Sequence, residues 1–236
     1  MSGRSPRWIR EPGVRVGALA VGSTVNLSVT GLLREFLVAH QGKPSSLYDD
    51  SCDGTWLLMK DCYENRVWHS VSNNGNSYKA SDIHSYLNGM FLGQFERNIR
   101  EAIKPAKIPY VNGVGSTGAV ASGADGLAAK VFLLSGYEIG MTQASYSQYL
   151  PVDGACLDYF SGTAATDAKR IAYLNGTATI WWLRSPHSNT STDAFDIHTS
   201  GALLFYSVSH SYGIRPAIIL PSNFYISADR IAEPAA

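Results

Sequence analysis

The chain has 236 residues, of which 45% are hydrophobic and 16% are charged, and its formal net charge at pH 7 is zero. A chain of this length and hydrophobic content can bury a full core, and the low, balanced charge argues against nucleic acid as a partner. No apolar run follows the basic N-terminus, so no signal peptide is visible, and no apolar stretch is long enough to predict membrane insertion.

We expect one main domain between two short terminal segments. Residues 1–13 are polar, contain two prolines and two glycines, and are typical of an arm or attachment segment. The domain is predicted to span residues 14–222 and to begin with a strand meander. Residues 223–236 are predicted to form a C-terminal tail.

Short alternating runs of apolar and polar residues from Val14 to His40 predict a meander of three strands. Turn signals occur at Gly22-Ser23 and at Thr30-Gly31, and the residues expected to share one buried face are Val25, Leu27 and Val29. The apolar run TWLLMK, residues 55–60, predicts a further strand.

A helical region is predicted after Ser81, a candidate N-cap, with Gly89 dividing it into two segments and Pro105 ending it. Apolar residues recur there every four positions and predict a stripe that faces the core: Phe91, Phe95, Ile99 and Ile103.

The remaining segments favour strands and loops. Residues 111–130 are rich in Gly, Ser and Ala and predict a long surface loop, whereas residues 131–135 predict a buried strand, followed by a short helical turn and a turn-rich excursion. Strands are expected near residues 179–184, 195–199, 202–208 and 213–220. Because strands outnumber helices and the helical region comes early, the predicted class is α+β with a mostly antiparallel sheet and long surface loops.

Catalytic and metal-binding signals are absent from the sequence. The cysteines Cys52, Cys62 and Cys156 lack CxxC spacing and are expected to be buried free thiols. The acidic run DDSCDG, residues 49–54, lacks the spacing of a calcium loop, and GVGSTG, residues 113–118, lacks the lysine of a phosphate-binding loop. We therefore expect no catalytic residue, no metal site and no cofactor.

Residues 187–212 have an unusual composition between two well-defined ends. Small polar residues and aromatic residues dominate, as in antibody binding loops, and Lys, Glu, Gln, Met and Trp are missing from His187 to Ala232. Those five amino acids are the ones that no codon ending in a pyrimidine encodes. Arg184, just before the segment, is expected to cap a turn or to pair with a carboxylate.

The motifs WWLRSP and YGIRPAIILP, with KVFLLSGYEIG and GTWLLMKDCYENR upstream, resemble an uncharacterised family of Gram-positive gut bacteria and their prophages. The C-terminal half resembles the C-type lectin fold of variable proteins from diversity-generating retroelements, including phage tropism determinants. In those proteins a variable segment precedes a closing G-(F/V/I)-R-P strand and displays a ligand-binding face.

This resemblance implies which side chains bind a ligand and which support them. The displayed positions are expected to be His187, Asn189, Thr190, Thr192, Asp193, Asp196, His198, Phe205, Tyr206, Ser207, Ser209 and His210. The positions expected to face inward as scaffold are Ala194, Ile197, Leu203 and Val208. The EPN, QPD and WND triplets of calcium-dependent lectins are absent, so calcium-mediated sugar binding is not implied.

By the resemblance, the protein is expected to be a non-enzymatic receptor-recognition protein, a tail-tip component of a phage or prophage. Its expected partners are a bacterial surface receptor, either protein or glycan, and other tail or virion proteins. A homo-oligomer, with a trimer favoured, and a location on the virion or on the bacterial cell surface follow from this hypothesis. The alternatives are a bacterial surface adhesin, a structural virion component without a receptor, and an enzyme of the formylglycine-generating type.

Overall fold

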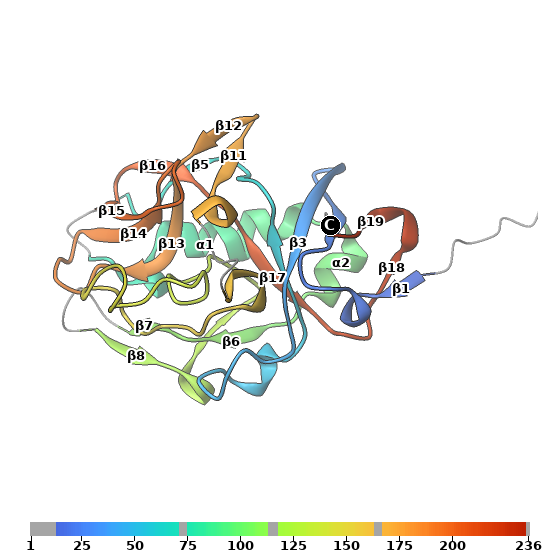
Figure 1. Cartoon of the computed structure of the whole chain (residues 1–236), viewed down its shortest axis with the longest axis horizontal. Coiled ribbons are helices and arrows are strands. Elements are labelled where there is room, and N and C mark those ends of the chain that lie inside the picture. The colour runs from blue at the N-terminus through green and yellow to red at the C-terminus, as the bar shows by residue number, and fades with distance from the viewer. Residues whose placement is uncertain (1–12, 71–74, 113–117, 163–166, 235–236) are drawn as a thin grey trace, which may run out of the picture.

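Two larger β-sheets organise the computed structural model, which describes residues 13–70, 75–112, 118–162 and 167–234 (Figure 1). The six-stranded sheet is antiparallel and has the order β10 (Val131–Phe132), β17 (Ala217–Leu220), β4 (Thr55–Met59), β3 (Leu32–Gln41), β2 (Thr24–Val29) and β19 (Ile231–Ala232). The five-stranded sheet has the order β15 (Leu203–Ser207), β14 (Asp193–Ile197), β13 (Trp181–Pro186), β16 (Ser211–Gly213) and β5 (Asn65–Val67), with one parallel pair, β13 and β16.

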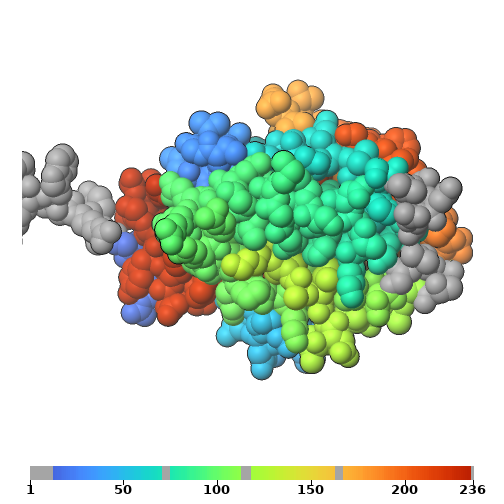
Figure 2. All heavy atoms as spheres, turned by 180° about the vertical axis from the view of Figure 1, so that it is seen from behind, coloured from blue at the N-terminus to red at the C-terminus, as the bar shows by residue number. Residues whose placement is uncertain are grey.

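Two-stranded pairs, short helices and turns make up the rest of the described structure. The two-stranded pairs are β1 (Gly13–Arg15) with β18 (Tyr225–Ser227), β6 (Ala106–Ile108) with β9 (Leu127–Ala129), β7 (Tyr110–Asn112) with β8 (Ala119–Ala121), and β11 (Ala172–Leu174) with β12 (Thr177–Thr179). The α-helices are α1 (Asp82–Tyr86) and α2 (Arg97–Ala102), separated by a π turn (Leu87–Phe91) and a 3-10 turn (Leu92–Gln94). Short 3-10 turns lie at Val16–Ala18, Asp50–Cys52, Tyr78–Ala80, Gly123–Asp125, Asp158–Phe160, Asp167–Arg170 and Ala228–Arg230. Seen from behind, the residues coloured green, which include α1 and α2, cover much of the molecule (Figure 2). This is an α+β fold, mostly antiparallel, as predicted.

The β2–β3 hairpin confirms part of the predicted meander. Thr30 and Gly31 both have positive φ in its turn, which matches the twist of the two strands. Val25, Leu27 and Val29 are fully buried. Three strands are present up to His40, but the prediction that they form one meander is wrong, because β1 pairs with β18 and a 3-10 turn separates β1 from β2. The third strand beside the hairpin is instead β4.

The helical region begins as predicted but is not continuous. The Ser81 hydroxyl caps α1 by accepting the His84 N–H at 3.1 Å. Between α1 and α2 the chain becomes extended at Phe95, where the Gln94 carbonyl accepts the Thr30 N–H and Glu96 N–H donates to Ser28. Backbone pairing with the β2–β3 hairpin thus replaces helical hydrogen bonds. All four residues of the predicted apolar stripe are buried.

Two further segments differ from their predictions. Residues 119–129, expected in a surface loop, contribute β8 and β9, and Leu127 is buried there; residues 113–117 lie outside the described residues. Residues 131–135 are fully buried as expected, but only the first two form a strand. The small residues of β8 and β9 lie in two-stranded pairs. Amino-acid composition alone does not predict that pairing.

The GIRPAIIL segment, predicted as one strand, divides between the two larger sheets. β16 ends at Gly213, β17 begins at Ala217, and Pro216 between them has no N–H to donate to a sheet. The chain therefore crosses from one sheet to the other at residues 214–216. Beyond it, residues expected in a C-terminal tail form β18 and β19, which pair with β1 and β2.

A buried ion pair ties β13 to the rest of the fold. Arg184 on β13 is bidentate to Glu138, at 2.5 and 2.7 Å, and the Tyr48 hydroxyl donates to Glu138 Oε1 at 2.7 Å. Arg184 also donates to the carbonyls of Leu133, Pro109 and Asp153. The expected pairing of Arg184 with a carboxylate is therefore confirmed, and it fixes β13 to four separate segments.

Candidate ligand-binding face

The sequence-predicted positions lie on β14, on β15 and in the loops around them, at one end of the five-stranded sheet (Figure 1). β15 is an edge strand that pairs with β14. β13, beside β14, is buried along all six of its residues. The face is thus carried by an edge hairpin on a packed strand.

The edge strand β15 exposes large apolar side chains on both of its sides. The exposed fractions of the consecutive residues Leu204, Phe205 and Tyr206 are 36%, 47% and 37%. Because successive side chains point to opposite sides of a strand, neither side of β15 is covered. We refer to the surface around β14, β15 and β16 as the edge face.

The predicted positions divide by exposure. Exposed are Asn189, Phe205, Tyr206, Ser209 and His210; half-buried are Thr190, Thr192, Asp193, His198 and Ser207. His187 and Asp196 are buried, which corrects the expectation that they are displayed. Of the expected scaffold positions, Ala194, Ile197 and Val208 are fully buried, and Leu203 is half-buried.

One side of the hairpin carries a cluster of rings around His187. The His187 ring centroid lies 4.3 Å from that of Phe205, 4.9 Å from Tyr149 and 5.3 Å from Phe195. Burial lowers the pKa of His187 below its ordinary value, which favours the neutral ring. His187 therefore packs beneath Phe205 and supports it.

One side-chain amide makes three hydrogen bonds to the loop before β14. The Asn76 side chain donates to the backbone carbonyls of His187, Thr190 and Asp193, at 3.1, 3.0 and 2.5 Å. These bonds fix a loop that otherwise has little regular structure. No local pattern in the sequence marks Asn76, because its partners lie more than a hundred residues away.

The other side of the hairpin carries a carboxyl among aromatic rings. Asp196 is paired in register with Trp182 on β13 and Leu204 on β15. Nearby, the Tyr212 ring lies 5.0 Å from Trp182, 5.4 Å from Tyr206 and 5.6 Å, stacked, from His210. The sequence did not reveal Tyr212 as part of this surface or Trp182 as the buried ring beneath it, because strand register brings both residues there.

Asp196 has an unusual environment for a carboxyl. Both of its carboxyl oxygens are buried and lack a hydrogen-bond partner among the residues that the structure describes. Burial raises the pKa of Asp196 to about 8. Near pH 7 the group is therefore mostly protonated and neutral.

The thiols are poorly suited to nucleophilic chemistry. Burial raises the pKa of Cys52 and of Cys62 to about 12, and it also raises the pKa of Cys156. All three cysteines are free, but Cys156 is exposed, so the prediction of three buried thiols is wrong for that residue. A thiol held protonated is a weak nucleophile.

Within the described ranges, no three His, Cys, Asp or Glu side chains come together as a group that could hold a metal ion. In that same part of the chain, no helix is both long and apolar enough for a membrane crossing.

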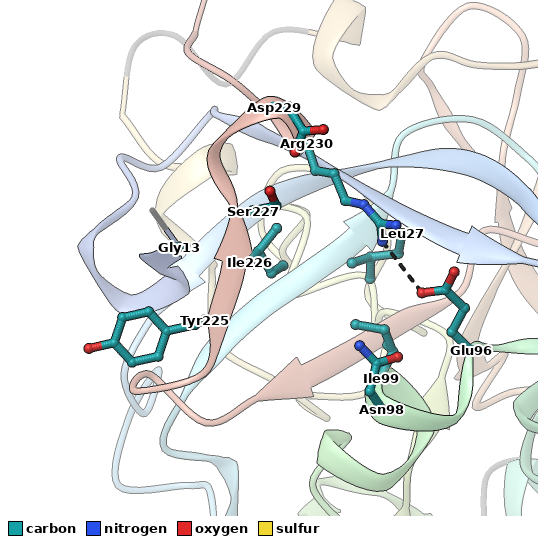
Figure 3. A pocket seen from close by; sticks show the side chains of 10 residues that line it. All are labelled: Gly13, Leu27, Glu96, Asn98, Ile99, Tyr225, Ile226, Ser227, Asp229 and Arg230. Carbon is teal, nitrogen blue, oxygen red and sulfur yellow. Dashed lines mark hydrogen bonds and ion pairs between the residues drawn. The ribbon is translucent and has the colours of Figure 1, made fainter. Parts of the chain in front are cut away.

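A groove of about 580 Å³ lies at the other end of the molecule, between α2 and the β1–β18 pair (Figure 3). Arg230 and Glu96 form an ion pair there, with 3.4 Å between Nη1 and Oε2, and Leu27 and Ile99 contribute apolar side chains. No predicted position lines this groove.

The fold and the edge face define an α+β protein in which one edge strand exposes three consecutive large apolar side chains. Residues 53–222 match the family model described as "Domain of unknown function (DUF6273)". The match covers more than half of the chain, so the chain belongs to the DUF6273 family. No curated protein and no solved structure matches the chain.

Proposed function

We propose that this DUF6273 protein is a non-enzymatic receptor-recognition protein, a tail-tip component of a phage or prophage, and that the edge face contacts a bacterial surface receptor. The observation that carries the proposal is the exposure of Leu204, Phe205 and Tyr206 side by side on β15. Large apolar side chains exposed on an edge strand are typical of a surface that a partner covers. Aromatic anchors supply much of the energy of such contacts.

The supporting structure favours recognition by a preorganised surface. β13 and the Asn76 amide hold the edge face from behind, so little ordering free energy is lost when a ligand binds. Polar groups such as Ser209 and His210 beside the rings add adaptable hydrogen bonds.

We further propose that the fold is C-type-lectin-like. The support is the placement of the two motifs that carry the resemblance: WWLRSP forms the buried strand β13 behind the edge face, and GIRP links the two larger sheets. Substitutions in the exposed positions between these motifs would change specificity and leave the core intact. A homo-oligomer, with a trimer favoured, would raise avidity through linked sites.

The test is binding of the purified protein to intact cells of Gram-positive gut strains. The variant Phe205→Ala/Tyr206→Ala/His210→Ala removes exposed anchors, and Asp196 is left unchanged because it is buried. We expect binding to be lost for strains that the wild type binds, with unchanged melting temperature. The matched control is Leu32→Ala/Leu33→Ala, which removes two side chains that are each 58% exposed on the β2–β3 hairpin and should leave binding intact.

Three outcomes would contradict the proposal or part of it. Equal binding by the wild type and the triple variant would remove the edge face as the receptor site. Absence of binding to any strain by the wild type would favour a structural virion component. A gene neighbourhood without tail genes, with binding retained by the wild type, would favour a bacterial surface adhesin.

A further inference from the structure

Arg215, the arginine of the GIRP motif, is buried and forms no ion pair with any carboxylate among the residues that the structure describes. It is 3% exposed, its Nε donates to the Met59 carbonyl at 2.9 Å, and its guanidinium carbon lies 5.1 Å from the centroid of the Trp181 ring. Its Nη1 is buried and has no hydrogen-bond partner in the described part of the chain. Arg184, by contrast, has both Nη atoms on Glu138. An unpaired buried charge is costly unless a partner completes it.

Arg215 lines a pocket of about 450 Å³ beside the six-stranded sheet. Tyr159 and Tyr173 contribute aromatic walls, and the Lys169 ammonium lies 4.6 Å from the centroid of the Tyr159 ring while donating to the Tyr159 carbonyl. The volume is in the range of small-molecule sites. No predicted position of the edge face lines this pocket.

The acidic residues of the pocket already have partners of their own. Glu35 forms an ion pair with Lys60 at 3.0 Å, and Asp61 accepts the Tyr173 N–H at 3.1 Å. Glu233 accepts the Ser23 hydroxyl at 3.3 Å. None of these three carboxylates forms a hydrogen bond with Arg215 Nη1. Their negative charges still offset the positive charges of the basic side chains in the pocket.

We propose that this pocket binds a small molecule through a carboxylate group that pairs with the Arg215 guanidinium. The planar guanidinium fork matches the two oxygens of a carboxylate. A phosphate is disfavoured, because three acidic side chains in the lining balance its three basic ones, so that no excess positive charge remains for the second charge of a phosphate. The tyrosine rings favour a ligand with a flat or apolar body next to its carboxylate.

The test uses acetate and benzoate as carboxylate probes and inorganic phosphate as the comparison, at constant ionic strength. The indole N–H signal of Trp181, which lies under the Arg215 guanidinium, reports binding by NMR. We expect a saturable shift with at least one carboxylate, tighter binding of benzoate than of acetate, and weaker binding of phosphate.

Two variants, each with a tryptophan in place of an exposed alanine, separate loss of binding in the pocket from loss of folding. Ala168 is exposed in the pocket lining, so Ala168→Trp fills the pocket without touching the contacts of Arg215 and should weaken carboxylate binding at least about tenfold. Ala128 is equally exposed on β9, outside the pocket, and Ala128→Trp should leave binding unchanged. Arg215→Lys keeps the charge, loses the fork and should also weaken binding.

The proposal is overturned if neither carboxylate gives a saturable shift, or if Ala168→Trp binds as well as Ala128→Trp does. Phosphate binding as tight as carboxylate binding would overturn the assignment of ligand class. Loss of binding by Arg215→Lys counts only if its melting temperature is retained; the Ala168 pair decides the matter when it is not.

Discussion

At the scale of single residues, Asp196 makes the stability of the fold depend on pH. Its pKa is raised from an ordinary 3.8 to about 8 because burial disfavours the charged form. Between these values the folded protein keeps a proton that the unfolded chain has lost. The free energy of unfolding therefore falls as pH rises through this window, by at most about 1.4 kcal/mol per pH unit from this group.

We predict that Asp196→Asn reduces this slope, since an amide of the same shape does not titrate. Urea unfolding of the wild type and the variant between about pH 5 and pH 8 measures it. Burial also raises the pKa of Asp153, to about 7, but that contribution is common to both proteins and cancels in the difference. Asp193→Asn, at a half-buried position on the same strand, is the control. The prediction would be wrong if the free energy of unfolding changed with pH by the same amount in the wild type and in Asp196→Asn.

At the scale of elements, the β14–β15 hairpin is anchored by its turn. Gly201 has φ +86°, and a Cβ added there would lie 2.1 Å from the backbone oxygen of Asp167. The turn therefore packs directly on the Asp167–Arg170 3-10 turn, and a side chain at this position forces the two apart.

We predict that Gly201→Ala lowers the free energy of unfolding by more than Gly176→Ala does. Gly176, in the β11–β12 turn, has a similar φ of +80° but nothing within 4 Å of an added Cβ, so it isolates the conformational cost of about 1 kcal/mol. Urea denaturation of both variants gives the comparison. Equal losses would mean that the contact with Asp167 is not a constraint in solution.

Sequence patterns predicted the elements that local chemistry determines. The Ser81 cap, the Thr30-Gly31 turn and the buried strand β4 were confirmed. Prediction failed where distant backbone groups compete, as at Phe95, where the β2–β3 hairpin interrupts the helix. The division of GIRPAIIL between two sheets was also missed, because alternation within one strand does not indicate a change of sheet.

The sequence also predicted only part of the edge face. Exposure of Phe205 and Tyr206 followed from the resemblance, whereas the burial of Asp196 depends on register: it shares a strand side with Ala194, between Trp182 and Leu204. A shift of one residue in that register would reverse every side chain of β14. Tyr212 reaches the face from β16, whose pairing no local pattern predicts.

At the scale of the whole molecule, both ends of the described chain help to complete the fold. β19 is the edge strand beside β2, and Ile226 on β18 is buried. We predict that a chain ending at Ser222 melts at a clearly lower temperature than one ending at Pro234. Removing β18 and β19 should lower the free energy of unfolding by more than the roughly 2 to 5 kcal/mol that is typical when one buried isoleucine is replaced by alanine. Thermal unfolding followed by circular dichroism compares the two. Identical melting curves would show that β18 and β19 are dispensable.

The β1–β18 pair and β19 lie at one end of the longest axis, and β15 lies at the other (Figure 1). A protein joined to a support through its β1 or β19 end would therefore hold β15, the strand of the proposed binding site, away from that support. Immobilisation through the β1 strand or the β19 strand should leave β15 accessible in binding assays. Random coupling through surface lysines would instead orient the copies in many directions.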